Sequence, residues 1–224
     1  MATERPPASP DQILQMLTTE HFTLQTARAA TIAEANGRSG LYLNVVGSGV
    51  VALAFIGQVT GMGEAFYAFA CVLFPSLFFL GFVTFERAIQ TSIENMIHAR
   101  GINRIRHYYV EVAPETARYL ILSTHDDTHG VLRGMGIPPS PWQHLVTNAG
   151  MVGGVNSILA GVFSGLAVGA VFEVSIGVRV GVGAAVCVLA FIGHRLWQNA
   201  RYTRSEMELD ILFPSPAPPD TEAQ

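Results

Sequence analysis

The side chains best suited to binding a ligand lie between Arg100 and Tyr109. This stretch brings together three arginines and two tyrosines. Guanidinium groups form paired hydrogen bonds with phosphate, and tyrosine rings favour the interface between membrane and water. We therefore expect an anionic lipid head group or a small phosphate ligand to be bound by Arg100, Arg104, Arg106 and Tyr108. The alternative is a solvated basic surface that only sets the orientation of the chain in the membrane.

A second chemically capable group is the sequence His-Asp-Asp-Thr-His at positions 125–129. Imidazole and carboxylate groups are common metal ligands, and a His-x-x-x-His pair shares one face of a helix. This spacing predicts a divalent-metal site formed by His125, Asp126 and His129. The alternative is that Asp126 and Asp127 cap a short helix beginning at Thr128 and that the histidines are ordinary surface residues.

Two asparagines, Asn44 and Asn156, lie inside long apolar runs. An amide group without a partner is costly in hydrocarbon, so each side chain requires a hydrogen-bonding neighbour. The simpler interpretation is that the two asparagines bond to each other or to nearby backbone and hold helices together. The other is that they form a polar constriction in a pore or substrate path.

No recognised catalytic motif accompanies these residues. The chain has no GxxxxGK[ST] loop, GxSxG elbow or HExxH pair, and it has no lysine for Schiff-base chemistry. A formal net charge of -4 argues against a nucleic-acid binder. Cys71 and Cys187 lie in apolar runs, which favours packing roles over a disulfide or metal site. We therefore expect a non-enzymatic protein that has no cofactor and no nucleic-acid partner.

The elements that position these residues are long apolar helices. Only 13% of the residues are charged, against about a quarter in soluble domains. The stretches 39–63, 65–85 and 134–172 contain no charge, and each is longer than the roughly 20 residues that cross a bilayer. A fourth apolar run follows Arg179, whose side chain can reach the interface. We predict membrane spans near 41–60, 65–85, 149–172 and 176–196.

The arginines indicate how the spans are oriented. The connector 61–64 has no arginine and the connector 173–179 has one, while the other arginines lie in the N-terminal, central and C-terminal segments. Positively charged segments remain in the cytoplasm. A basic set made only of arginine is typical of a high-GC bacterial genome. We therefore expect a multi-pass protein of the bacterial plasma membrane with both termini in the cytoplasm.

The two predicted hairpins also resemble each other. Sliding the sequence by 112 residues aligns Asn44 with Asn156 and Gly81 with Gly193, among other identities between positions 36 and 94 and the later copy. Both copies start in the cytoplasm, so they form parallel repeats related by an axis along the membrane normal. The predicted fold is all-α, with four transmembrane helices in two parallel-repeat hairpins and long cytoplasmic helical extensions.

Small residues recur at four-residue spacing in the second hairpin, and they let helix backbones approach closely. They can hold the third span against the fourth, or hold one protomer against another in a homo-oligomer. Pro75 is expected to kink the second span. The ridge residues are Gly153, Ser157, Gly161, Gly165 and Gly169 in the third span, followed by Gly177 and Gly181 in the fourth.

The remaining segments are predicted from capping and breaking signals. Ser9-Pro10-Asp11-Gln12 is typical of a helix start, and the helix is expected to run on into the first span. The apolar stripe changes phase at Arg100-Gly101, which predicts a bend or break there. The expected division is an N-terminal helix (1–38), a first hairpin (39–86), a cytoplasmic helical segment (87–148), a second hairpin (149–197) and a helix end with a disordered Pro-rich tail (198–224).

Two stretches carry a resemblance to known proteins. Arg-Ile-Arg-His-Tyr-Tyr (104–109) and Ser-Thr-His-Asp-Asp (123–127), together with the four-span layout without lysine, resemble a group of uncharacterised actinobacterial four-span integral membrane proteins. A helical hairpin with long cytoplasmic helices also resembles, in architecture alone, the SLATT-type membrane effectors of bacterial conflict systems. The resemblance implies a membrane location and no particular reaction.

Three functions fit these observations. The first is an oligomerising scaffold, sensor or pore-forming effector of the inner membrane. The second is a small transporter or channel for a neutral solute or metal ion, with Asn44 and Asn156 at a constriction and positions 125–129 as a cytoplasmic binding site. The third is an adaptor that binds acidic lipid through the arginines of 100–106. The first is favoured by the repeat, the small-residue ridges and the cytoplasmic helices.

Overall fold

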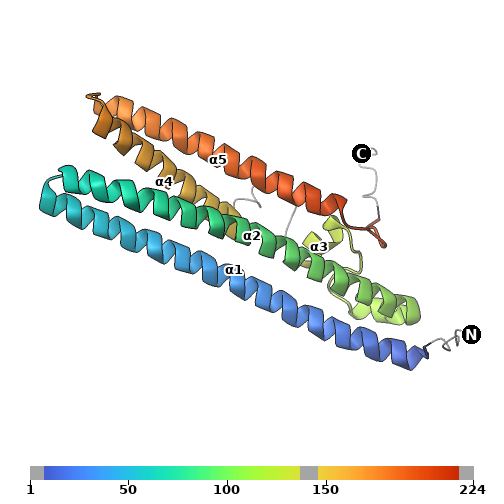
Figure 1. Ribbon diagram of the computed structural model, residues 1–224. Helices are drawn as coiled ribbons and strands as arrows, with labels where there is room; N and C mark the ends of the chain where they lie inside the picture. Colours follow the sequence, from blue (N-terminus) through green and yellow to red (C-terminus); the bar gives the residue numbers. More distant parts are fainter. Residues whose placement is uncertain (1–7, 137–145, 217–224) are drawn as a thin grey trace, which may run out of the picture. The chain divides into compact units, whose positions relative to one another are not determined.

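The computed structural model describes residues 8–136 and 146–216, and over these ranges the ordered elements are all helical (Figure 1). The prediction of an all-α fold is confirmed. Ser140-Pro141, a pair typical of a helix start and expected to begin the third long helix, lies outside the described residues. The elements are the α-helices α1 (Pro10–Thr60), α2 (Glu64–Val112), α3 (Thr128–Gly134), α4 (Asn148–Val171) and α5 (Ile176–Met207), with a 3-10 helix, η1 (Pro114–Tyr119).

The chain forms two compact units, and each is assembled from separate stretches of sequence. Counting the described residues, unit 1 contains 8–32, 94–136 and 209–216, and unit 2 contains 33–93 and 146–208. Helices α1 and α2 therefore each contribute one end to unit 1 and the other end to unit 2.

Four helices, α1, α2, α4 and α5, are long and apolar enough to cross a membrane. Many apolar side chains on these helices are exposed, including Val51, Phe79 and Leu189 at close to 70%. An apolar outer surface of this kind is stable in hydrocarbon and unfavourable in water. The protein is therefore a multi-pass membrane protein.

The start of α1 is as the sequence predicts. The Ser9 amide donates to Gln12 Oε1 at 2.9 Å, and the Gln12 amide donates to Ser9 Oγ at 3.3 Å. This reciprocal pair is a capping box, which satisfies donors that the first turn leaves free. From Pro10 the helix continues without interruption to Thr60, so the predicted N-terminal helix and the first span are one element.

The predicted break at Arg100-Gly101 is wrong, because α2 continues through it to Val112. Two neighbours cover different faces of the helix there. A Cβ at Gly101 would lie 2.8 Å from Leu24 Cδ1 of α1, and on another face Asn103 Nδ2 donates to His125 O at 2.7 Å. The change of phase in the apolar stripe therefore marks a second packing partner rather than the end of the helix. Pro75 lies inside the same helix and does not end it.

Helices α4 and α5 meet at glycines. A Cβ at Gly161 would lie 2.6 Å from Gly183 O, and one at Gly165 would lie 3.0 Å from Arg179 O, so the two backbones are in contact. Gly161 and Gly165 of the predicted ridge thus pack within their own hairpin, whereas a Cβ at Gly153 would lie nearest to Phe85 of α2, at 3.1 Å. On α5 the partner is Gly183, whereas a Cβ at Gly181 would meet nothing within 4 Å.

Candidate functional site

Unit 2 contains a buried cluster of polar side chains within its apolar core. We call it the polar node; it consists of Tyr42 of α1, Asn156 and Ser157 of α4, and His194 of α5. Tyr42 Oη donates to Asn156 Oδ1 at 3.4 Å, and Asn156 Nδ2 lies 3.4 Å from His194 Nε2. Asn156 is 0% exposed. The node therefore satisfies a carboxamide that hydrocarbon could not.

Helix α2 has no polar side chain in the node, but its Gly81 leaves the room that the node occupies. A Cβ built on Gly81 would lie 2.7 Å from Tyr42 Oη and would overlap the carboxamide oxygen of Asn156. Only glycine leaves room here for both polar groups. All four spanning helices therefore meet at the node.

The hydrogen bonds of His194 fix which of its nitrogens carries the proton. Nδ1 lies 2.7 Å from Ala190 O, and a carbonyl oxygen can only accept, so Nδ1 is the donor. Nε2 is then the acceptor for Asn156 Nδ2. Ser157 Oγ donates to Gly153 O at 2.7 Å and lies 3.2 Å from His194 Nδ1. With Nδ1 as donor and Nε2 as acceptor, both ring nitrogens of His194 have hydrogen-bond partners.

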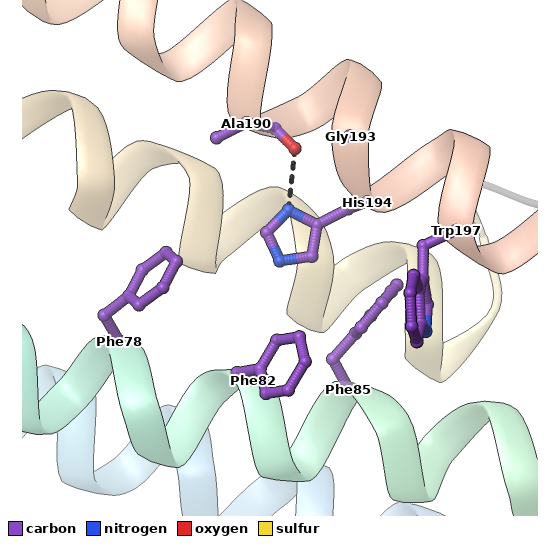
Figure 2. Close-up of a pocket in the computed structure, with 7 residues that line it drawn as sticks. All are labelled: Phe78, Phe82, Phe85, Ala190, Gly193, His194 and Trp197. Carbon is purple, nitrogen blue, oxygen red and sulfur yellow. Dashed lines mark hydrogen bonds between the residues drawn. The ribbon is translucent and has the colours of Figure 1, made fainter.

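An aromatic pocket of about 290 Å³ adjoins the node. Figure 2 shows Phe78, Phe82 and Phe85 of α2 facing His194 and Trp197 of α5 across it. Phe85 meets the imidazole edge to face, with ring centroids 4.8 Å apart. The lining is almost wholly apolar, so the pocket suits a hydrocarbon group and offers no obvious place for a reaction.

Outside the apolar core of unit 2, polar side chains join neighbouring helices. Glu34 accepts two hydrogen bonds from Arg87, at 2.9 and 3.0 Å, and one from Arg38 at 2.8 Å. These arginines hold the pKa of the Glu34 carboxyl at about 2. Glu86 accepts from Trp197 Nε1 at 2.8 Å and pairs with Arg201 at 2.8 Å. These ion pairs and hydrogen bonds join α1 to α2 and α2 to α5. These charged groups are thus paired within the chain itself.

Unit 1 holds a second polar centre, which binds the C-terminal segment. Asp126 is fully buried and accepts hydrogen bonds from the amides of Leu212 and Phe213, at 3.1 and 2.8 Å. Arg104 Nε donates to Asp126 Oδ2 at 2.7 Å, and Arg104 also donates to Asp210 O. We call this contact between Asp126, Asp127 and residues 210–215 the tail clasp.

Asp127 and an aromatic stack complete the clasp. Asp127 caps α3 by accepting from the Gly130 amide at 2.8 Å, as the sequence predicts. It also accepts from the Ser215 amide at 3.0 Å and from Ser215 Oγ at 2.7 Å. The ring of Phe213 stacks on His107 with centroids 3.8 Å apart. Residues 213–215 are thus held within unit 1, whereas the sequence predicts a disordered Pro-rich tail within 198–224.

The four residues predicted to bind phosphate are in different environments. Arg100 is 3% exposed and donates to Thr128 Oγ1 at 3.1 Å, and Arg104 belongs to the tail clasp. Arg106 and Tyr108 are half-buried, and Arg106 Nη1 donates to Asn103 Oδ1 at 3.3 Å. Two of the three arginines are therefore committed to other parts of the chain, and binding of an anion by this set stays a prediction.

The predicted metal ligands also have other roles. Both carboxylate oxygens of Asp126 accept hydrogen bonds from amides or from Arg104, and His129 is exposed. Among residues 8–136 and 146–216, no group of three or more His, Cys, Asp or Glu side chains is arranged to hold a metal. The metal site stays a prediction that the described side chains do not assemble.

The two predicted intramembrane asparagines are not equivalent. Asn156 is at the centre of the polar node, whereas Asn44 is exposed on α1 and makes no hydrogen bond within the described part of the chain. Asn44 lies in a shallow groove along α1 with Gly47 and Ser48. They therefore do not bond to each other, which was one of the predicted arrangements.

Tyr42 and His194 were not among the site residues predicted from the sequence. A histidine within an apolar span is a signal in itself, because ionisable groups at that depth require partners. No protein family model, curated protein or solved structure matches the chain, so the resemblance to actinobacterial membrane proteins also stays a prediction.

Replacing Gly81 with alanine is expected to destabilise the protein. The added methyl group displaces the Tyr42 hydroxyl or the Asn156 amide, and overpacking of this kind costs about 1–3 kcal/mol. The matched control is Gly193→Ala on α5, where a Cβ meets nothing within 4 Å. Thermal unfolding in detergent should show a lower midpoint for the first variant and an unchanged or higher one for the second. Equal midpoints would refute the steric role of Gly81.

Replacing Asp126 with asparagine is expected to open the tail clasp. Burial by itself raises the pKa of Asp126, but the amides of Leu212 and Phe213 together with Arg104 outweigh it and leave the pKa below its ordinary value. An amide has one accepting oxygen and a donating NH₂ group that opposes the second backbone amide. Hydrogen bonds to a charged group are worth about 1.5–3 kcal/mol, so exchange of the Leu212 and Phe213 amides should accelerate about tenfold or more.

The Asp126 carboxyl also makes the stability of the tail clasp depend on pH. Because the folded-state pKa lies below the unfolded one, the stabilisation is complete at neutral pH and is lost as the pH falls through the folded-state value. Asp11→Asn, an exposed site on α1, serves as the control for the change of charge. Unchanged exchange in Asp126→Asn would show that the clasp does not depend on this carboxylate.

Proposed function

We propose that the protein is a non-enzymatic, oligomerising scaffold or sensor of the bacterial plasma membrane, with both termini in the cytoplasm. Unit 2 is the membrane anchor and unit 1 is the cytoplasmic part. The distribution of arginines supports this orientation. The one arginine in a predicted external connector, Arg179, donates to Val174 O at 3.2 Å and packs on Gly169, so its own hairpin accommodates it.

The observation that carries the oligomeric part of the proposal is the unpartnered carboxamide of Asn44. It lies one turn before Ser48 on an exposed face of a spanning helix, with Gly47 between them. Hydrocarbon cannot bond an amide, whereas a second helix of the same kind can, because the group both donates and accepts. Small residues beside the amide allow that helix to approach closely.

The predicted repeat accounts for the lack of a hydrogen-bond partner for Asn44 among the described residues. Asn156 is bonded by Tyr42 and His194, and the shift of 112 residues places Gly154 and Phe82 at the equivalent positions around Asn44. Neither residue has a side chain that forms such a bond. A hydrogen bond of 2.9 Å between Asn148 and Asn36 joins two equivalent positions of the repeat, as expected for side chains near a pseudo-symmetry axis. The proposed duplication has thus kept both asparagines but only one set of partners.

The closed polar node favours a scaffold over a channel within one protomer. Asn156 is completely buried, and the hydrogen bonds of Tyr42, Ser157 and His194 are directed within the bundle. A solute path would require these groups to face water. A pore-forming effector would therefore have to form its channel between protomers.

Replacing Asn44 with leucine is expected to weaken association without unfolding the protein. Polar contacts between membrane helices contribute about 0.6–2 kcal/mol, so the dissociation constant should rise about threefold or more. The matched control is Ser76→Leu, because Ser76 is also exposed on a spanning helix but its hydroxyl already bonds to Val72 O.

Counting fluorophore bleaching steps in dilute proteoliposomes measures the association. The proposal predicts oligomers for the wild type and for Ser76→Leu, and more monomers for Asn44→Leu. A wild type that is monomeric at every protein density would overturn it. Ion conductance in the same liposomes distinguishes a pore-forming effector from a scaffold.

A further inference from the structure

The seam between α1 and α2 in unit 1 is lined by basic groups. From α1 it contains His21, Leu24 and Arg28, which share one helix face at spacings of three, four and seven residues. The ring of His21 stacks on Tyr109 of α2 with centroids 6.2 Å apart, and Arg28 Nε donates to Asn95 Oδ1 at 2.9 Å. We call His21, Arg28 and Arg106 the basic seam.

Its two arginines differ from five others, which form ion pairs with carboxylates. Arg28 and Arg106 are both half-buried, and each donates only to the neutral carboxamide oxygen of an asparagine. Within the described residues neither pairs with a carboxylate. Arginines that do so are Arg38, Arg87, Arg104, Arg201 and Arg204.

The three basic groups also influence one another. Burial lowers the pKa of Arg28 and of Arg106, and the charge of Arg28 lowers that of Arg106 further. Burial, followed by the charge of Arg106, lowers the pKa of His21. Like charges that are partly removed from water repel one another, and a nearby anion relieves the repulsion.

His21 supplies a buried donor to the same seam. Its Nε2 lies 2.8 Å from Gln25 Nε2, and because an amide NH₂ group only donates, Nε2 is the acceptor. Nδ1 therefore carries the proton of the neutral ring, and this buried atom has no hydrogen-bond partner among residues 8–136 and 146–216. A buried N–H group without an acceptor is unfavourable by about 1–3 kcal/mol.

We infer that the basic seam binds a phosphate-type oxyanion, with the guanidinium groups of Arg28 and Arg106 and the Nδ1–H group of His21 as donors. The planar guanidinium groups match the tetrahedral oxygens of phosphate. Of the residues predicted from the sequence to bind phosphate, only Arg106 belongs to this site, and it is joined there by two residues of α1. The phosphate can belong to a soluble compound or to a lipid head group.

The experiment uses the full chain in nanodiscs, with thermal stability as the readout. Pyrophosphate added to nanodiscs of neutral phosphatidylcholine tests a soluble source, with sodium chloride at matched ionic strength as the reference. Nanodiscs containing phosphatidylglycerol, without pyrophosphate, test a lipid source. Saturable stabilisation in the first arm identifies a soluble phosphate compound, and stabilisation only in the second identifies a lipid.

Arg28→Gln and Arg106→Gln should each weaken the apparent affinity for the stabilising probe about tenfold or more, since each removes a charged donor. Arg118→Gln is the control, because Arg118 lies in η1 of the same unit with its guanidinium over the Tyr119 ring. Without probe, Arg28→Gln and Arg106→Gln should be at least as stable as the wild type, because each relieves repulsion. No response to either probe, or the same response in both variants, would overturn the inference.

Discussion

The rest of unit 2 depends on one constraint, which is that hydrocarbon offers no hydrogen bonds to a polar group. Asn156 meets this constraint by drawing Tyr42 and His194 towards it from two other helices. Gly81 then has to be glycine, because the side chains that satisfy the amide occupy the space beside α2. A single carboxamide thereby fixes the rotation of all four spanning helices about their own axes. Apolar packing, which is similar for many rotations, could not fix them alone.

Unit 1 is stabilised in a different way, because its buried charged groups bond to residues from distant parts of the chain. Asn103 is at its centre: its oxygen accepts from Arg106, and its amide NH₂ group donates to His125 O, next to the tail clasp. One buried side chain thus connects the basic seam with the segment that holds the C-terminal tail. Arg106 is therefore linked through Asn103 to the backbone of His125, the residue before Asp126.

The spans were predictable because absence of charge over a long run is a local property of the sequence, as in 65–85. The capping box at Ser9 and the cap at Asp127 were predictable for the same reason. Long-range partners were not. Asp126 is bonded to residues that follow it by more than eighty positions, and nothing near it in the sequence distinguishes a buried carboxylate from a metal ligand.

The phase change at Gly101 is another case in which the sequence pattern does not predict a long-range contact. A one-dimensional pattern records that a different helix face is buried, but it does not record whether the helix bends or gains a neighbour. Likewise, Asn44 and Asn156 have similar apolar surroundings in the sequence. Their different environments depend on whether position 42 or 154 carries a tyrosine, and that comparison has meaning only once the helices are paired.

The tail clasp also determines when the protein can finish folding. Helices α1 and α2 are synthesised first, and Asp126 and Asp127 follow soon after. Their partners at 210–215 are synthesised only after α4 and α5 have emerged. Until residues 210–215 have been synthesised, Asp126 and Asp127 lack the backbone amides that they bond in the folded protein, so unit 1 remains incomplete while α4 and α5 are made. Unit 1 can therefore be completed only after all four of the long apolar helices have been synthesised.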